Sequence, residues 1–155
     1  FHEDEEYVAK KFHMVKEHGM IPVLCVGETE KERQSGKTLT VLSRQLSAIT
    51  EHMQAADKHT AFQGCVVAYE PVWAIGTGLT AKPSDAAEVH GNIRQMIAEL
   101  SPGCEAALPI LYGGSVNEKT AGALFEMPEI DGGLVGGAAL KAEQFLEVIQ
   151  CIKSS

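Results

Sequence analysis

Glu70 is the residue of this sequence whose position most directly suggests chemistry. It follows the apolar run at residues 65–69, and Pro71 comes directly after it. A carboxylate at the carboxyl end of a buried strand is costly to place there, so it usually has a function. Trp73 and a glycine-rich stretch at residues 76–78 come next. A loop that is stiff at its start and rich in glycine afterwards is typical of a lid over such a residue.

Three other apolar runs also end in residues suited to a ligand site. They are followed by Glu28, by the Gly113–Gly114 pair with Ser115, and by the Gly136–Gly137 pair. Glycine pairs let backbone N–H groups approach an anion closely, and the amino end of a following helix adds partial positive charge. We therefore predict a phosphate site that uses backbone amides and no lysine, formed by Gly76, Ser115, Gly136 and Gly137.

Alternating strands and helices must position these residues. Continuous apolar runs predict strands at 21–26, 65–69, 108–112 and 132–135, as in parallel sheets covered by helices. Helical spacing and capping signals predict three helices in the first part of the chain: one from acidic residues 3–6 to Gly19, one capped by Thr29 with Glu32, and one over 39–53. Three more are predicted later: one capped by Ser84 that reaches about Leu100, a short one from Asn117, and one over 142–152. The alternation indicates an α/β fold, and a doubly wound sheet would give the same pattern.

Length and charge limit the classes of function. The 155 residues are enough for one domain, whereas a complete (β/α)8 barrel needs roughly 200 residues or more. The formal net charge of -8 disfavours nucleic acid and anionic membranes as partners, because both favour a basic face. No apolar run is long enough to span a membrane, and the acidic amino terminus is unlike a signal or transit peptide. We expect a cytoplasmic protein.

The sequence indicates no cofactor and no metal. The four cysteines stand far apart without metal-ligand spacing, which is typical of buried or free thiols in a reducing cytosol. None of the six histidines follows a predicted strand, so we expect all six in solvated helices or loops. Residues 76–81 fit a dinucleotide motif loosely but lie five residues beyond their strand. Residues 36–38 lack the first glycine position of a P-loop, and Asn117 replaces the last glycine of a nucleophile elbow.

The order of these motifs resembles the triosephosphate isomerase family along the whole chain. The block Ala-Tyr-Glu-Pro-Val-Trp-Ala-Ile-Gly-Thr-Gly at 68–78 is the most specific match, and segments 22–29, 112–117 and 131–140 follow in the family's order. The resemblance implies a single partial TIM-barrel domain over residues 1–155. This domain would be the C-terminal half of a (β/α)8 barrel, four βα units preceded by a helix, with the N-terminal half absent.

The resemblance also implies roles for particular residues. Glu70 is similar to the general base that moves a proton between C1 and C2 of a triose phosphate through an enediolate, a step of glycolysis and gluconeogenesis. Gly76, Ser115, Gly136 and Gly137 match backbone donors to the substrate phosphate. The lid and its support would comprise Glu28, Pro71, Trp73, Ala81 and Tyr112. Within this group we expect Glu28 to orient loops by hydrogen bonds and Trp73 to pack in the lid.

Two residues of the family's mechanism have no counterpart in this sequence. They are the lysine after the first barrel strand and the electrophilic histidine after the fourth, which the family pairs with its glutamate base. We therefore expect the chain alone to lack useful isomerase activity, and the complete family enzyme to be a homodimer. Two alternatives remain open: a non-catalytic half-barrel folding or assembly unit, and another phosphate-binding barrel enzyme, which would share the glycine pairs but not the Glu70 block.

Overall fold

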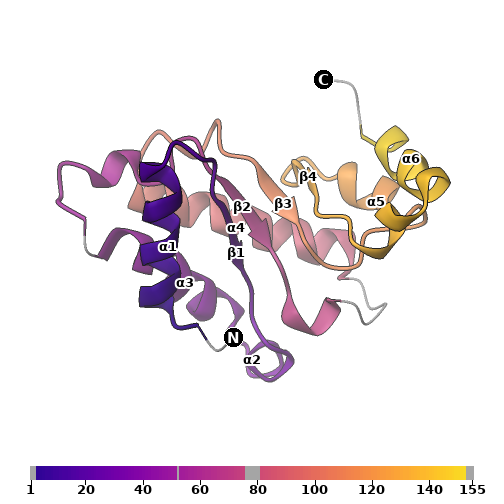
Figure 1. Ribbon diagram of the computed structural model, residues 1–155. Helices are drawn as coiled ribbons and strands as arrows, with labels where there is room; N and C mark the ends of the chain where they lie inside the picture. Colours follow the sequence, from indigo (N-terminus) through magenta and orange to yellow (C-terminus); the bar gives the residue numbers. More distant parts are fainter. Residues whose placement is uncertain (1–2, 52, 76–80, 153–155) are drawn as a thin grey trace.

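The computed structural model describes residues 3–51, 53–75 and 81–152, and its centre is one parallel sheet of four strands (Figure 1). The strands stand side by side in chain order: β1 (Val23–Val26), β2 (Val66–Tyr69), β3 (Ile110–Tyr112) and β4 (Gly132–Gly133). Their pairing brings Val26 beside Tyr69 and Tyr69 beside Tyr112. The carboxyl ends of the strands, and the residues that follow them, therefore meet at one edge of the sheet.

One α-helix precedes the first strand, and the others connect successive strands or follow the last one. Their bounds are α1 (Glu5–Glu17), α2 (Glu30–Gln34), α3 (Thr38–Glu51), α4 (Pro83–Leu100), α5 (Ala121–Phe125) and α6 (Ala142–Gln150). The described residues also form three short 3-10 helices: η1 (Lys58–Thr60), η2 (Val72–Ala74) and η3 (Gly137–Leu140). The chain thus consists of four βα units preceded by a helix, and the prediction of a parallel α/β fold is confirmed.

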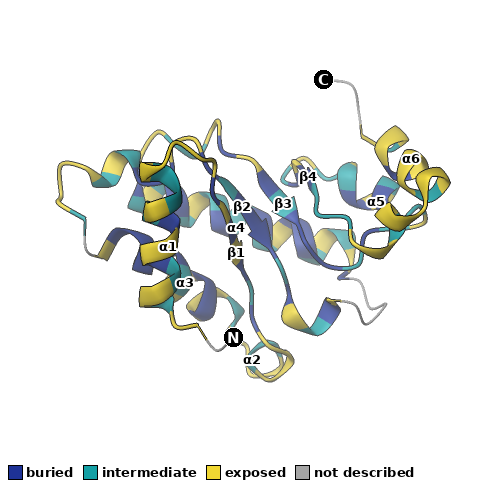
Figure 2. Ribbon diagram, in the orientation of Figure 1, coloured by how far each residue is buried: buried dark blue, intermediate teal, exposed yellow. Residues whose placement is uncertain are grey.

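The two faces of the sheet differ in what covers them. Leu24 and Val26 belong to the core formed with the helices and are almost fully buried, and buried residues run along the central strands (Figure 2). Val23 and Cys25, which alternate with them along β1, are exposed. A doubly wound sheet reverses its strand order and carries helices on both faces. Sequential strand order with one covered face is instead the arrangement of a barrel wall.

Several predicted element ends were right and others were wrong. The Thr29–Glu32 capping box is present, and Gly19 adopts the positive φ that ends a helix cheaply. However, α4 begins at Pro83 rather than after Ser84, because proline suits the first helical turn and the Ser84 hydroxyl donates to Asp85 instead. The chain after Asn117 first forms a turn.

The remaining corrections concern the last two units. The Asn117 side chain accepts the N–H groups of Lys119 and Thr120, which delays helix α5 to Ala121. The last strand is two residues long rather than four. The Leu134 N–H still donates to the Tyr112 carbonyl, so the chain remains beside β3 after β4 ends.

One histidine contradicts the expectation that all six are solvated. His90 is fully buried, because it lies on the apolar stripe of α4 formed by Ala86, Ile93 and Ile97. Positions 86, 90, 93 and 97 follow the three- and four-residue spacing of one helix face, so the periodicity of the sequence carried this signal. His2 and His52 lie outside the described residues.

Candidate active site

A cavity of about 480 Å³ opens at the carboxyl edge of the sheet. It brings together four of the predicted site residues, Glu70, Ser115, Gly136 and Gly137, from the ends of β2, β3 and β4. Other lining residues include Ile75, Gly113, Gly114, Asn117 and Leu134. Gly76, the remaining residue of the predicted phosphate site, lies outside the described residues.

Glycines on both neighbouring strands leave space for Glu70. A Cβ atom on Gly27 would lie 1.9 Å from the Glu70 carbonyl oxygen, and one on Gly113 would lie 2.4 Å from Glu70 Cγ. Two backbone hydrogen bonds hold the segment in this position: Glu70 N–H donates to the Val26 carbonyl at 2.7 Å, and Gly113 N–H donates to the Tyr69 carbonyl at 2.8 Å. The half-buried Glu70 side chain therefore lies against the Gly113–Gly114 segment and lines the cavity.

The opposite wall of the cavity has glycines of a different kind. A Cβ atom on Gly136 or Gly137 would contact nothing within 4 Å, so local packing does not require glycine at either position. The described lining contains no lysine and no arginine. The donors available to an anion in this part of the cavity would be backbone N–H groups and the side chains of Ser115 and Asn117. The Ser115 hydroxyl donates to the Ala74 carbonyl at 3.1 Å and joins this wall to η2.

Glu28 follows β1 as Glu70 follows β2, but its carboxylate is fully buried and bound by protein groups. It accepts the Tyr69 hydroxyl at 3.1 Å and the Trp73 indole N–H at 3.0 Å. The Arg33 guanidinium lies 3.8 Å from Glu28 and stacks over the Trp73 ring at 4.5 Å. These contacts are those expected of a glutamate that orients loops.

Tyr112 connects β3 to the segment before α4. Its hydroxyl accepts the Ala81 N–H at 3.1 Å, and a Cβ atom on Gly114 would lie 2.3 Å from that hydroxyl. Glycine at 114 is therefore needed for the close approach. Burial raises the pKa of the Tyr112 hydroxyl above its ordinary value, so the group remains a neutral hydroxyl. Pro71 directly precedes η2, which contains Trp73. The lid itself, residues 76–80, lies outside the described residues.

Cys25 is a neighbour of Glu70 that the sequence analysis did not single out. Cys25 is exposed to solvent on one side only, and this partial burial of the thiol, followed by the adjacent Glu70 carboxylate, raises the pKa of Cys25 to about 11. The thiol therefore stays protonated at neutral pH and places no second negative charge beside Glu70. The signal in the sequence was the pairing of β1 with β2, which puts Cys25 beside Ala68, two residues before Glu70.

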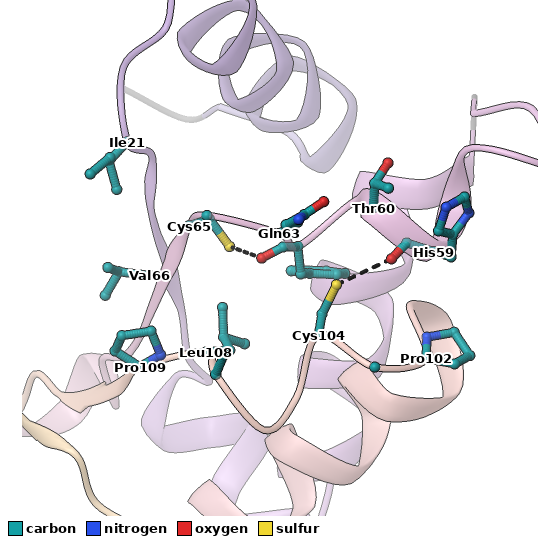
Figure 3. Close-up of a pocket in the computed structure, with 14 residues that line it drawn as sticks. Ile21, His59, Thr60, Gln63, Cys65, Val66, Pro102, Cys104, Leu108 and Pro109 are labelled. Carbon is teal, nitrogen blue, oxygen red and sulfur yellow. Dashed lines mark hydrogen bonds between the residues drawn. The ribbon is translucent and has the colours of Figure 1, made fainter.

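A second cavity, of about 530 Å³, lies at the amino ends of the strands (Figure 3). Ile21, Val66 and Pro109 line it, together with the thiols of Cys65 and Cys104, which donate to the carbonyls of Phe62 and His59. Its lining has no carboxylate, and it is at the end of the sheet opposite Glu70. The described residues contain no cluster suited to a metal ion, and none of their helices is long and apolar enough to cross a membrane.

Comparison with known proteins agrees with this architecture. The family described as Triosephosphate isomerase matches residues 1–152. The chain is 57% identical over 152 residues to triosephosphate isomerase of Legionella pneumophila (strain Lens), a match that covers 98% of the chain and 59% of that relative. It is 49% identical over 153 residues to the enzyme of Enterobacter cloacae, a match that covers 99% of the chain and 58% of the relative.

The chain therefore spans less than two thirds of the length of these curated relatives. Its four βα units correspond to half of the eight in a TIM barrel, so the fold is an α/β half-barrel. The family match along almost the whole chain, together with the strand-end glutamate and glycines in one cavity, leads to one conclusion: this chain belongs to the triosephosphate isomerase family.

Proposed function

We propose that this chain, as one partial domain over residues 1–155, supplies strands five to eight of a triosephosphate isomerase barrel. The observation that carries the proposal is the cavity shared by Glu70, Ser115, Gly136 and Gly137. The exposed Val23 and Cys25 on the uncovered face support it, because the inner face of a barrel is packed by side chains from all of its strands.

In the proposed reaction Glu70 transfers a proton between adjacent carbons of a triose phosphate. The carboxylate takes a proton from the carbon beside the carbonyl, and the electron pair forms an enediolate. The hydroxyl proton then moves from the first oxygen to the former carbonyl oxygen, and the protonated Glu70 returns its proton to the former carbonyl carbon. Dihydroxyacetone phosphate and glyceraldehyde 3-phosphate interconvert in this way without oxidation, and no cofactor is consumed. Backbone amides near Ser115, Gly136 and Gly137 would hold the phosphate at the far wall of the cavity.

The complete protein is proposed to be a homodimer that acts in the cytoplasm on this small phosphorylated substrate. All four cysteines are free thiols, which supports a reducing compartment. The family's lysine and electrophilic histidine have no counterpart here. A positioned donor to a developing oxyanion is typically worth about 3 kcal/mol of the activation barrier. The chain by itself is therefore expected to show no useful turnover.

The test is to restore the missing part of the relatives' length. The chain is joined to the unmatched amino-terminal part of the Legionella pneumophila (strain Lens) relative, and we call the product the completed protein. Triose phosphate interconversion is measured for the chain alone, for the completed protein and for its Glu70→Gln variant. We expect activity only in the completed protein, and a loss of about 1000-fold in kcat in the variant, since general bases contribute 10²–10⁴-fold.

Glu88→Gln is the matched control, because Glu88 is an exposed glutamate on α4 and should leave kcat unchanged. A kcat within threefold of the parent in Glu70→Gln would remove Glu70 from the proposed role. A completed protein that folds as the relatives do but has no activity would favour the alternative of a non-catalytic assembly unit.

A further inference from the structure

His90 has an unusual environment for a polar side chain. It is 0% exposed, and neither ring nitrogen makes a well-formed hydrogen bond among the described residues, although the backbone carbonyls of Glu129 and Ile110 lie close enough to act on the ring. Burial of a polar group without a hydrogen bond costs free energy, so each such group calls for an explanation. Helix α4 could fill the same space with an apolar side chain at lower cost.

The imidazole lies against two tyrosines from neighbouring strands. Its ring centroid is 5.9 Å from that of Tyr69, with the rings nearly perpendicular at 87°. It is 6.3 Å from that of Tyr112, with an interplanar angle of 36°. The two tyrosines face each other in the strand register, and their own rings are 6.4 Å apart. His90 therefore packs against both tyrosines from the helical layer.

Each tyrosine directly precedes a segment of the candidate active site. Tyr69 is followed by Glu70, and Tyr112 is followed by Gly113, Gly114 and Ser115. Both tyrosines are also anchored at their hydroxyls, Tyr69 on the buried Glu28 and Tyr112 on the Ala81 N–H. A shift of either ring would move the backbone that carries the site residues.

The site leaves little tolerance for such a shift. Glu70 Cγ lies only 2.4 Å from the position of a Cβ atom on Gly113. The Tyr112 hydroxyl lies 2.3 Å from the corresponding position on Gly114. The separation of the ends of β2 and β3 therefore determines where the Glu70 carboxylate lies relative to Ser115. Misplacement of a catalytic group by about 1 Å can lower a rate about 100-fold.

We propose that His90 is a positioning residue, whose ring sets the separation of Tyr69 and Tyr112 and thereby the place of Glu70 opposite the Gly113–Ser115 segment. The expected effect of His90 on kcat rests on the proposed isomerase function. Its expected effect on the position of Glu70 does not. His90 is not among the described residues that line the cavity, and it acts through the two tyrosines.

The experiment compares His90→Ala, His90→Leu and Ile97→Ala in the completed protein. His90→Ala removes the ring, whereas leucine restores a similar volume without buried polar atoms. Ile97 is equally buried on α4, seven residues and about 10 Å further along the helix. We expect kcat to fall about tenfold in His90→Ala, with KM changed less than twofold. In His90→Leu and Ile97→Ala, kcat should stay within threefold of the parent.

Amide chemical shifts of Glu70 and Gly113 supply a readout independent of turnover. They should move in His90→Ala and stay unchanged in Ile97→Ala. If the completed protein itself is inactive, that result counts against the proposed function and not against the role of His90, because the amide chemical shifts still test that role. A folded His90→Ala variant with unchanged shifts would overturn the positioning role. An equal loss of kcat in Ile97→Ala would overturn it too, because general destabilisation would then explain both variants.

Discussion

Two glutamates follow neighbouring strands in this protein, and they differ in burial and in hydrogen bonding. Glu28, after β1, is fully buried and accepts hydrogen bonds from Tyr69 and Trp73, with Arg33 beside it. Glu70, after β2, is half-buried and lines a cavity of about 480 Å³. The residue type is the same and both lie just beyond a strand end, Glu70 one residue and Glu28 two residues after it, but the groups around each carboxylate differ.

The difference shows what makes a strand-end carboxylate available for chemistry. A carboxylate whose lone pairs are occupied by protein donors stabilises the loops that supply those donors. A carboxylate that glycines admit to an open cavity lies where a ligand can reach it. Gly27 and Gly113 provide that space around Glu70, whereas Tyr69 and Trp73 close the space around Glu28.

The largest expected effect tests the structural side of this comparison. Glu28→Ala removes the acceptor of two buried donors and the partner of Arg33, so we expect the free energy of unfolding to fall by about 4 kcal/mol. Glu70→Ala should lower it by less than about 1 kcal/mol, because that side chain is half-buried. Urea unfolding of both variants of the completed protein measures the two values. Equal losses would show that the two glutamates do not differ as proposed.

The dependence of stability on pH tests the packing of His90 against Tyr69 and Tyr112, the residues that precede the site segments. Burial lowers the pKa of His90 to about 4, and Arg94 acts in the same direction. Asp131 and the nearby carbonyls of Glu129 and Ile110 partly oppose this shift. The unfolded chain therefore binds a proton near pH 6.5 that the folded chain does not bind until about pH 4.

The resulting stability is present above pH 6.5 and is lost as the pH falls towards 4. From this residue we expect a loss of about 3 kcal/mol across that window. The free energy of unfolding is measured against pH for the completed protein and for its His90→Leu variant. The difference isolates the contribution of His90, because Tyr69 and Tyr112, the rings that face it, remain in both proteins. An identical slope in the two proteins between pH 6.5 and 4 would assign the acid sensitivity to other groups.

The smallest expected effect concerns the wall opposite Glu70. Gly137→Val adds a side chain where a Cβ atom contacts nothing, so the fold should tolerate it while an anion in the cavity is crowded. We expect inorganic phosphate to bind the completed protein about tenfold more weakly, equivalent to about 1.4 kcal/mol. Ala139→Val, an exposed position in the same short helix η3, is the control. Unchanged phosphate affinity in folded Gly137→Val would place the anion site elsewhere.

Local features of the sequence were sufficient to predict most of the fold. The four apolar runs became the four strands, and the Thr29–Glu32 capping box formed as expected. The start of α4, the start of α5 and the length of β4 were wrong, because each depends on competition between nearby side-chain and backbone hydrogen bonds. The cavity residues Glu70, Ser115, Gly136 and Gly137 were predictable because parallel strands bring their carboxyl ends to one edge.

The sequence by itself thus determined the family, the alternation of strands and helices, and the residues that follow each strand. Only the tertiary structure decided which of those residues are bound by protein groups. The donors to Glu28 come from Tyr69 and Trp73, 41 and 45 residues along the chain. The burial of His90 likewise depends on Tyr69 and Tyr112, which belong to two different strands. Such contacts join distant segments, so no local pattern of residues specifies them, and the pairing of the strands together with the packing of α4 on the sheet creates them.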